Sequence, residues 1–344
     1  MDERLQEWGF VPHVVCAVFG TSDGVEIERT INEFCERRLH AGVGAHEFFY
    51  ASVGSVHGVR LADARRVVVK AGLPGPRMAF LTAAQGMQRH LVAHGFPCPE
   101  PLTEPAPLAA GIAVVESCLD VGTRGDPHEP ALRRAMAATL AELVVLCRPL
   151  DRLRRALGDR PGDARRLWPT PHDARFDFDR TTRGAEWIDA LAVRAKAQRA
   201  GRGESVLGHC DWRAQNMRFA ADKVVAVYDW DSICCVAEPQ LVGSAAHYFT
   251  SDFEVEGRRQ LPSLEEAVGF IGDYQAARGV AFDAKEQQIA RAALVYSMAY
   301  TARCEHSDAL TDFGRKAPSG ELGPIPEGSA RAFLVRHAEN LLAG

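Results

Sequence analysis

The first third of the chain alternates between helical and strand-like hydrophobic patterns. Residues 23–40 carry apolar side chains at helical spacing, and Asp23 can cap the helix that this spacing predicts. Residues 80–95 predict a second helix that stops at Gly95. Runs rich in β-branched and aromatic residues predict buried strands at 46–53, 59–71 and 111–120, with Gly-Ser-Val-His-Gly between the first two.

The rest of the chain has mainly helical periodicity. Helices are expected at 131–150, 184–200, 263–279, 284–307 and 329–342. Residues 151–183 are rich in Arg, Asp and Pro and are expected to form a loop. The pattern predicts an α+β protein with two lobes, a small β-rich lobe over residues 1–120 and a larger, mostly helical lobe over residues 121–344.

Composition narrows the class of protein. The chain has 344 residues, 47% hydrophobic and 25% charged, which is ordinary for a globular protein large enough for two lobes. The net charge of -5 argues against a nucleic-acid partner. No segment approaches the roughly 18 unbroken apolar residues of a membrane span, and the N-terminus lacks a signal-peptide pattern. A cytoplasmic monomer or homodimer without a membrane partner is expected.

The nine cysteines are scattered and form no C-x-x-C pair, so neither a zinc ribbon nor a thioredoxin-type site is indicated. Cys234 and Cys235 lie in an apolar run. We expect buried free thiols, because free cysteine packs as a small hydrophobic residue.

Candidate chemistry is concentrated between residues 207 and 231. Asp211 and Asn216 lie on one expected loop, and Asp229 follows an apolar strand-like run, Val224–Tyr228. An Asp can orient a hydroxyl and accept its proton, while Asn and Asp oxygens can ligate magnesium beside a nucleotide. His209 is expected to have a structural role, in which its side chain holds the backbone of this loop in place.

Three other residues of this segment are open to more than one role. Trp212 and Trp230 are expected to pack in the interior, with stacking on a sugar or a base as the alternative. For Asp231, a contact to metal or substrate and a capping role are equally open.

The segment HCDWRAQN resembles the H-G-D-x-x-x-x-N loop of the aminoglycoside phosphotransferase and choline kinase superfamily, whose members are small-molecule relatives of protein kinases. The following YDWDS is similar to the metal motif of that family. The resemblance implies a protein-kinase-like fold, ATP or GTP as phosphate donor and Mg²⁺. It implies that Asp211 is the catalytic base and that Asn216 and Asp229 hold the metal.

The resemblance also extends to the first lobe. Lys70 matches the strand lysine that contacts the α- and β-phosphates, and the segment Glu116–Leu119, with Glu116 and Cys118, falls where the hinge would meet the adenine. The chain departs from the family at three points. Cys210 replaces the usual glycine, VGSVHG (53–58) stands in place of a Gly-rich loop, and Gln85 and Gln88 occupy the helix where a Glu partner for Lys70 is expected.

The acceptor is less well defined by sequence. Residues 238–312 are acid-rich and residues 151–200 are arginine-rich, a mixture that leaves room for a neutral or acidic acceptor. The resemblance implies an ATP-dependent O-phosphotransferase acting on a small molecule, with an aminoglycoside, nucleoside or other sugar-containing antibiotic as first candidate and resistance as its role. A metabolic kinase for choline, a sugar or an amino alcohol, an inactive nucleotide-binding scaffold, and a metal-dependent hydrolase using His209, Asp211, Asp229 and Asp231 are the alternatives.

Overall fold

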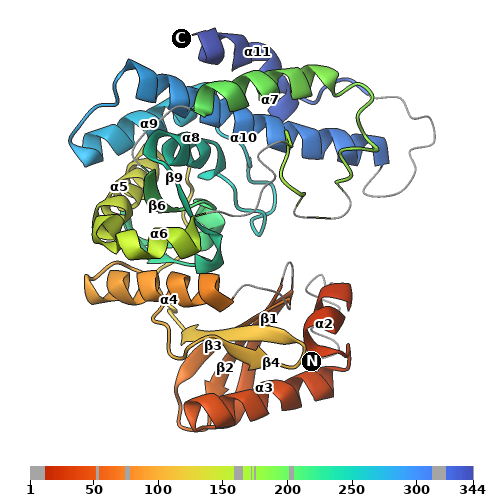
Figure 1. The fold of residues 1–344 in the computed structure, drawn as a ribbon, viewed down its shortest axis with the longest axis vertical. Helices are drawn as coiled ribbons and strands as arrows, with labels where there is room; N and C mark the ends of the chain where they lie inside the picture. Colours follow the sequence, from red (N-terminus) through yellow and green to blue (C-terminus); the bar gives the residue numbers. More distant parts are fainter. Residues whose placement is uncertain are drawn as a thin grey trace. The chain divides into compact units, whose positions relative to one another are not determined.

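The computed structural model describes residues 12–51, 54–73, 78–158, 166–171, 173, 176–200, 205–311 and 323–343. The chain divides into two compact units, Met1–Val121 and Gly122–Gly344 (Figure 1). The first combines helices with an antiparallel sheet and the second is mainly helical, so the predicted α+β class is confirmed. No helix in these described ranges has the length and apolar character needed to cross a membrane.

The first unit is built on an antiparallel sheet of five strands in the order β1-β2-β3-β5-β4. The strands are β1 (Val43–Ala51), β2 (Gly54–Leu61), β3 (Arg66–Gly72), β4 (Ala106–Leu108) and β5 (Gly111–Ser117). The helices are α2 (Pro12–Phe19), α3 (Gly24–Leu39) and α4 (Met78–Ala93).

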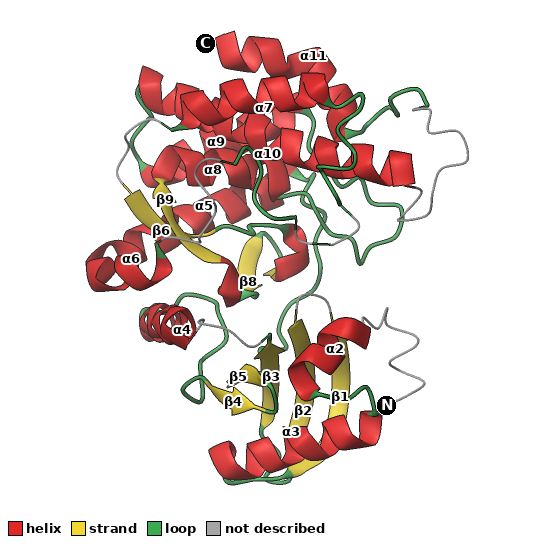
Figure 2. Ribbon diagram, turned by 45° about the vertical axis from the view of Figure 1, so that its right-hand side comes forward, coloured by secondary structure: helices red, strands yellow, loops and turns green. Residues whose placement is uncertain are grey.

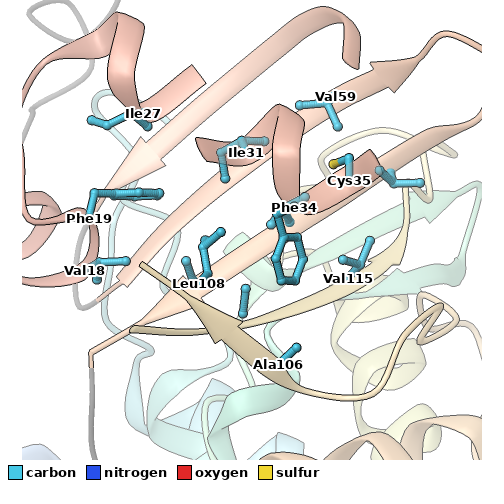
Figure 3. Packing of buried hydrophobic residues seen from close by; sticks show 14 of the residues in the cluster. Val18, Phe19, Ile27, Ile31, Phe34, Cys35, Val59, Ala106, Leu108 and Val115 are labelled. Carbon is cyan, nitrogen blue, oxygen red and sulfur yellow. The ribbon is translucent and has the colours of Figure 1, made fainter. Parts of the chain in front are cut away.

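Helix α3 has the predicted cap and apolar face. The Asp23 carboxylate accepts hydrogen bonds from the first backbone N–H groups of the helix, and Ile27, Ile31 and Phe34 are buried. These side chains join the hydrophobic core of the sheet unit (Figure 3). Burial of each side chain of this size contributes roughly 1.5–3 kcal/mol, so the periodic face is enough to fix the helix in the core.

The prediction of one strand over residues 59–71 is wrong. The chain turns at residues 62–65, where the Leu61 N–H donates to the Arg65 carbonyl at 2.8 Å and Ala64 adopts a φ of 71°. The Gly-Ser-Val-His-Gly segment, expected to be the turn, belongs to β2. A side chain at Gly58 would overlap the Phe48 ring, so the glycine serves close packing rather than a reversal of the chain.

The second unit contains most of the helices (Figure 2). They are α5 (Pro130–Cys147), α6 (Asp151–Leu157), α7 (Glu186–Arg199), α8 (Glu238–Tyr248), α9 (Leu264–Arg278), α10 (Ala284–Thr311) and α11 (Ala330–Ala343). Short 3-10 turns occur at η1 (Arg148–Leu150), η2 (Ala214–Asn216) and η3 (Trp230–Ser232). Two antiparallel strand pairs complete the unit, β6 (Ser205–His209) with β9 (Ile233–Ala237), and β7 (Met217–Ala220) with β8 (Lys223–Val227).

Helix α10 packs against α7, α8 and α11. Gly243 of α8 allows a close approach, because a side chain there would overlap the Ala290 backbone of α10. The expected loop over residues 151–183 is wrong at its start, where α6 forms. Part of that loop, at 159–165, 172 and 174–175, lies outside the described residues, as does Val53 of the expected phosphate cover.

Candidate active site

The β7–β8 ladder brings Asn216 close to Asp229. Met217 pairs with Val227, and the Tyr228 N–H donates to the Asn216 carbonyl at 2.8 Å. Asn216 precedes the first strand and Asp229 follows the second, so both side chains emerge at the same end of the hairpin. The pairing of β7 with β8 thus fixes the spacing between the oxygen-bearing side chains of Asn216 and Asp229.

A second ladder holds the loop that carries Asp211. His209 pairs with Ile233 at the ends of β6 and β9, and the Cys210 N–H donates to the Ser232 carbonyl at 2.8 Å. Asp211 therefore leaves its strand beside the turn that carries Asp229. The two antiparallel pairs together explain why Asp211 and Asp229, 18 positions apart in the sequence, lie in one corner of the unit.

Asp211 is half-buried and held by two polar neighbours. The Asn216 side-chain N–H donates to the Asp211 Oδ2 at 2.9 Å and to its carbonyl oxygen at 3.0 Å. An Arg213 guanidinium nitrogen lies 2.9 Å from the same Oδ2. These contacts fix one face of the carboxylate and place a cation directly beside it.

Arg213 is a site residue that sequence reasoning missed. Its signal was available, because it is a cation two residues after Asp211 on the same short loop. Read alone, such an arginine is usually a solvated surface residue. Only the structure shows that its guanidinium pairs with Asp211.

His209 has the structural role that was expected. It is fully buried, its Nε2–H donates to the Tyr228 carbonyl at 2.9 Å, and its Nδ1 accepts from the Asp211 N–H at 3.3 Å. Burial lowers the pKa of this imidazole, which fits a neutral ring with one donor and one acceptor nitrogen. His209 thus links the Asp211 loop to the strand that leads to Asp229.

Both tryptophans of the motif pack in the interior, as expected. Trp212 donates from its ring nitrogen to the Met136 carbonyl at 3.2 Å, and Trp230 donates to the Val227 carbonyl at 2.8 Å. Each makes an edge-on contact with the His209 ring. The two indoles therefore clamp the imidazole that positions the loop.

Asp229 has a left-handed backbone, with φ 68° and ψ 51°. This conformation costs an ordinary side chain roughly 1–2 kcal/mol, although Asp tolerates it better than most residues. Strained backbone of this kind is concentrated at functional sites. The half-buried Asp229 carboxylate and the Asn216 amide oxygen fit Mg²⁺, which commonly takes one or two protein oxygens and completes its shell with phosphate and water.

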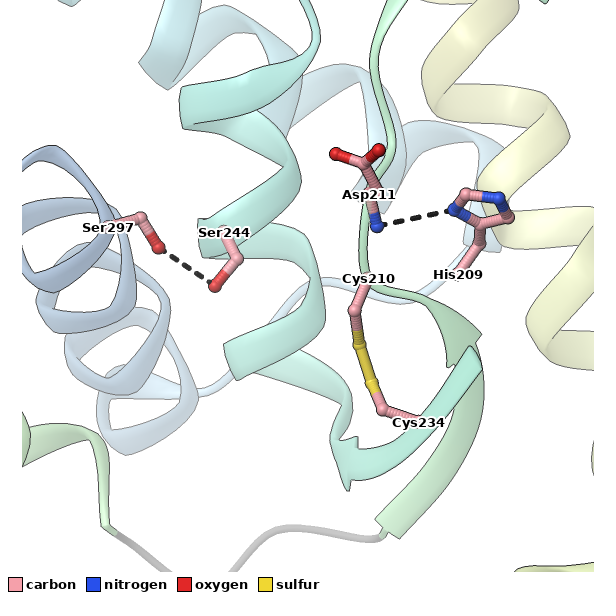
Figure 4. The surroundings of a disulfide bond; sticks show 6 residues. All are labelled: His209, Cys210, Asp211, Cys234, Ser244 and Ser297. Carbon is pink, nitrogen blue, oxygen red and sulfur yellow. Dashed lines mark hydrogen bonds between the residues drawn. A yellow bond between two sulfur atoms is a disulfide. The ribbon is translucent and has the colours of Figure 1, made fainter. Parts of the chain in front are cut away.

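Cys210 is joined to Cys234 by a disulfide, so the expectation of free thiols is wrong for this pair (Figure 4). The Cα atoms are 6.2 Å apart, within the range that disulfides span. The cross-link follows from the β6–β9 register, which places Cys234 opposite Gly208, two residues before Cys210. The residue that replaces the glycine of the resembled loop therefore ties that loop to β9.

In the first unit, Lys70 forms an ion pair with Glu116 at 2.7 Å. The two residues lie on adjacent strands, where Lys70 pairs with Val114 and Val68 pairs with Glu116, so they are diagonal neighbours on one face of the sheet. Gln88 of α4 donates to the other Glu116 oxygen at 3.3 Å. A strand carboxylate, supported by a helix glutamine, thus pairs with Lys70 where the family resemblance implies a Glu on the helix.

The segment expected to form the hinge, Glu116–Leu119, begins in the last two residues of β5 and continues beyond the strand. Cys118 is half-buried, and its N–H donates to the Arg66 carbonyl at 3.1 Å. Burial raises the pKa of its thiol, so the side chain is neutral near pH 7. Glu116 is buried, and its carboxylate is occupied by Lys70 and Gln88.

A cavity of about 470 Å³ opens in the second unit beside the Asp211 loop. His209, Cys210 and Trp212, which flank Asp211 in sequence, form part of its wall. The opposite walls come from α7, α8, α10 and the segment around Trp168. Its described lining contains three Lys or Arg residues and no Asp or Glu. Sequence reasoning did not find this cavity, because its walls come from distant segments.

The antiparallel sheet unit, the helical unit and the Asp211 loop define a protein-kinase-like phosphotransferase fold. Solved structures share it at low identity. An amicoumacin kinase in complex with AMP-PNP and Ca²⁺ has a TM-score of 0.58 and 10% identity, covering 94% of this chain and 96% of the other. A spectinomycin phosphotransferase in complex with ADP and spectinomycin has a TM-score of 0.55 and 9% identity, covering 90% and 98%.

An ethanolamine kinase of Plasmodium vivax is also similar, with a TM-score of 0.52 and 12% identity over 99% of this chain and 92% of the other. No curated protein matches the chain in sequence. Residues 58–240, more than half of the chain, match the model of the phosphotransferase enzyme family. The chain belongs to this family, which confirms the predicted superfamily and the prediction of a phosphotransferase enzyme.

Proposed function

We propose that this protein transfers the γ-phosphate of ATP to a hydroxyl of a small molecule. The observation that carries the proposal is the corner formed by Asp211, Asn216 and Asp229, where a hydrogen bond joins the first two and one hairpin joins the last two. Phosphoryl transfer needs a positioned hydroxyl and neutralised charge more than covalent help from the protein. This corner supplies groups for both.

Asp211 is the proposed catalytic base. Its carboxylate orients the acceptor hydroxyl and takes its proton as the acceptor oxygen bonds to the γ-phosphorus. The bond from that phosphorus to the β–γ bridging oxygen breaks, and ADP leaves with the bonding electrons. The Asn216 and Arg213 contacts hold the carboxylate in one orientation, which reduces the entropy lost at the reacting centre.

Arg213 and the metal ligands are proposed to balance negative charge. The Asn216 amide oxygen and the Asp229 carboxylate would hold Mg²⁺, which neutralises phosphate charge when it is bound. The Arg213 guanidinium lies beside Asp211, so it would be near an acceptor hydroxyl bound there and would attract a phosphate oxygen. Asn216 then has two tasks, with its nitrogen on Asp211 and its oxygen available to the metal.

Lys70, Glu116 and Cys118 are the proposed nucleotide residues of the first unit. Lys70 would contact the α- and β-phosphates, and Glu116 would orient it through their 2.7 Å ion pair. The backbone around Cys118 would meet the adenine, or the guanine of GTP. The complexes of the structural neighbours with AMP-PNP and ADP support a nucleotide as the donor.

Two classes of acceptor have support. The likeness to a spectinomycin phosphotransferase and an amicoumacin kinase favours an antibiotic and a role in resistance. The likeness to an ethanolamine kinase favours a metabolic alcohol instead. Expression in a sensitive host and a panel of hydroxyl metabolites separate the two. The test of the shared proposal is ADP release coupled to a phosphate-sized mass gain on an acceptor, which an inactive scaffold or a hydrolase would not produce.

A further inference from the structure

We propose that the cavity beside Asp211 binds the acceptor and selects one that carries an anionic group next to a flat apolar ring, rather than a polycation. This inference rests on the proposed function, because it names the acceptor class of the same site. It concerns residues of the second unit alone.

The cavity lies beside the loop that carries the candidate base. His209, Cys210 and Trp212 line it, so its wall runs along the backbone that carries Asp211. Figure 4 shows this segment opposite α8, which contributes Ser244 to the lining. Tyr248, one turn further along α8, has its hydroxyl pKa raised by burial and then by the nearby Tyr300 and Asp211. A ligand in this cavity would therefore lie beside the backbone of the loop that carries Asp211.

The charged side chains that line the described part of the cavity are all cationic. Arg199 and Lys196 lie three residues apart on α7 and line it together with Arg166. The Arg199 guanidinium carbon lies 3.6 Å from the centre of the Tyr296 ring. In the described part of the chain, no carboxylate lies within ion-pair distance of Arg199. A half-buried guanidinium that stacks on an aromatic ring is stabilised further when an anion accepts hydrogen bonds from its N–H groups.

The acid-rich segment does not reverse this charge, because its buried acids are engaged elsewhere. Glu238 accepts from the Tyr274 hydroxyl at 2.7 Å and pairs with Arg278 at 3.0 Å. Asp252 pairs with Arg124 and Arg258, each at 3.0 Å. Carboxylates that a polycation would need are thus committed to ion pairs within the second unit.

Other acids of the same region are used in the same way. Glu266 pairs with Arg259 at 2.7 Å, and Glu305 accepts from the first N–H groups of α11. The arginine-rich residues 151–200 behave differently, because they supply the three cations of the cavity. The acid-rich segment therefore adds no carboxylate to the described lining of the cavity, whereas the arginine-rich segment adds three cations.

The aromatic walls are fixed before any ligand binds. The Trp168 ring nitrogen donates to Asp189 at 3.0 Å, and the Tyr296 hydroxyl donates to the Leu167 carbonyl at 2.6 Å. The two rings are 5.5 Å apart with an interplanar angle of 34°. Tyr300 lies 6.1 Å from Trp168 and completes the wall. Because the polar ends of Trp168 and Tyr296 are hydrogen-bonded, their rings offer apolar faces that favour a flat ligand ring.

Three compounds of nearly equal shape test the inference by charge alone. They are para-(hydroxymethyl)benzoate, para-(hydroxymethyl)benzamide and para-(aminomethyl)benzyl alcohol, which carry the same hydroxyl and ring with an anionic, neutral or cationic end. Binding is measured by calorimetry without nucleotide, and transfer is measured by mass gain with ATP. We expect the benzoate to bind at least about tenfold more tightly than the amide and the amine, as a charge-assisted hydrogen bond predicts. Equal or tighter binding of the amine would overturn the inference.

Arg199→Gln tests whether the Arg199 guanidinium is the group that binds the anion. We expect this variant to lose about tenfold or more in affinity for the benzoate and to change its affinity for the amide by less than about twofold. Arg194→Gln is the matched control, because Arg194 lies on the same helix but is exposed and pairs with Glu339 at 2.7 Å. Benzoate binding that is unchanged in Arg199→Gln overturns the inference.

The two readouts separate this inference from the proposed function. Transfer to cationic acceptors that is insensitive to Arg199→Gln would keep the phosphotransferase and overturn the anionic acceptor. Benzoate binding that depends on Arg199, without transfer to any acceptor, would support the cavity assignment and count against the proposed function. The comparison of the three probes in the unaltered protein stands even where a variant is unstable.

Discussion

Replacing Cys234 by serine opens the Cys210–Cys234 disulfide while it leaves the β6–β9 ladder in place. A cross-link stabilises mainly by restricting the unfolded chain, and its effect grows with the length of the closed loop. The sequence separation of 24 residues corresponds to about 3.5 kcal/mol in the chain-entropy model. For a unit of this size we expect the melting temperature to fall by about 7–14 °C.

Calorimetric or spectroscopic melting of the oxidised protein, the reduced protein and Cys234→Ser measures this effect. Reduction and substitution should give the same decrease, because both remove the same covalent bond. Cys235→Ser is the matched control, since Cys235 is the next residue and takes no part in a disulfide. A melting temperature of Cys234→Ser within about 1 °C of the oxidised parent would refute the reasoning.

Three further predictions concern single side chains. Glu116→Gln removes the charge that lies 2.7 Å from Lys70, so the KM for ATP should rise about tenfold with a smaller change in kcat, and a nucleotide titration that shows parental affinity would contradict this role. Arg213→Gln should lower kcat about a hundredfold, because a charge-stabilising donor is lost, and steady-state kinetics with parental kcat would remove Arg213 from the site. Burial alone would raise the pKa of Glu266, but hydrogen bonds led by that from Arg259 lower it to about 2. The depressed pKa stabilises the fold above about pH 4.5, and this stabilisation is lost as the pH falls towards 2. Glu266→Gln should therefore lower the free energy of unfolding by about 1 kcal/mol at pH 7, after allowance for solvent screening, and by much less at pH 3. Urea titrations at the two pH values can check this difference.

The elements that sequence reasoning placed correctly are those whose signals are local. Helix α3 combines an Asp23 cap with apolar residues at helical spacing, and both signals lie within the helix itself. The grouping of Asp211, Asn216 and Asp229 also followed from short-range sequence signals, since one loop and one hairpin contain all three residues. Side chains in such segments have few alternative neighbours.

The errors came from features that depend on tertiary contacts. The turn at residues 62–65 contains two alanines and no glycine or proline, while Gly58 of β2 accommodates the Phe48 ring. Glu116 reaches Lys70 only because β5 lies beside β3, although the two strands are separated by α4 in sequence. The Arg199–Tyr296 contact likewise joins α7 to α10. No local pattern reports such pairings.

The central claim is that Asp211 accepts the acceptor proton during phosphate transfer. The most direct measurement is single-turnover transfer from labelled ATP to a pool of anionic, neutral and cationic hydroxyl compounds, with the unaltered protein and Asp211→Asn compared side by side. We predict a phosphate-sized mass gain on an acceptor with the unaltered protein. With Asp211→Asn we predict a rate at least about a hundredfold lower and nearly unchanged ATP affinity, because the base is not a phosphate ligand. Transfer by Asp211→Asn at the parental rate would contradict the account.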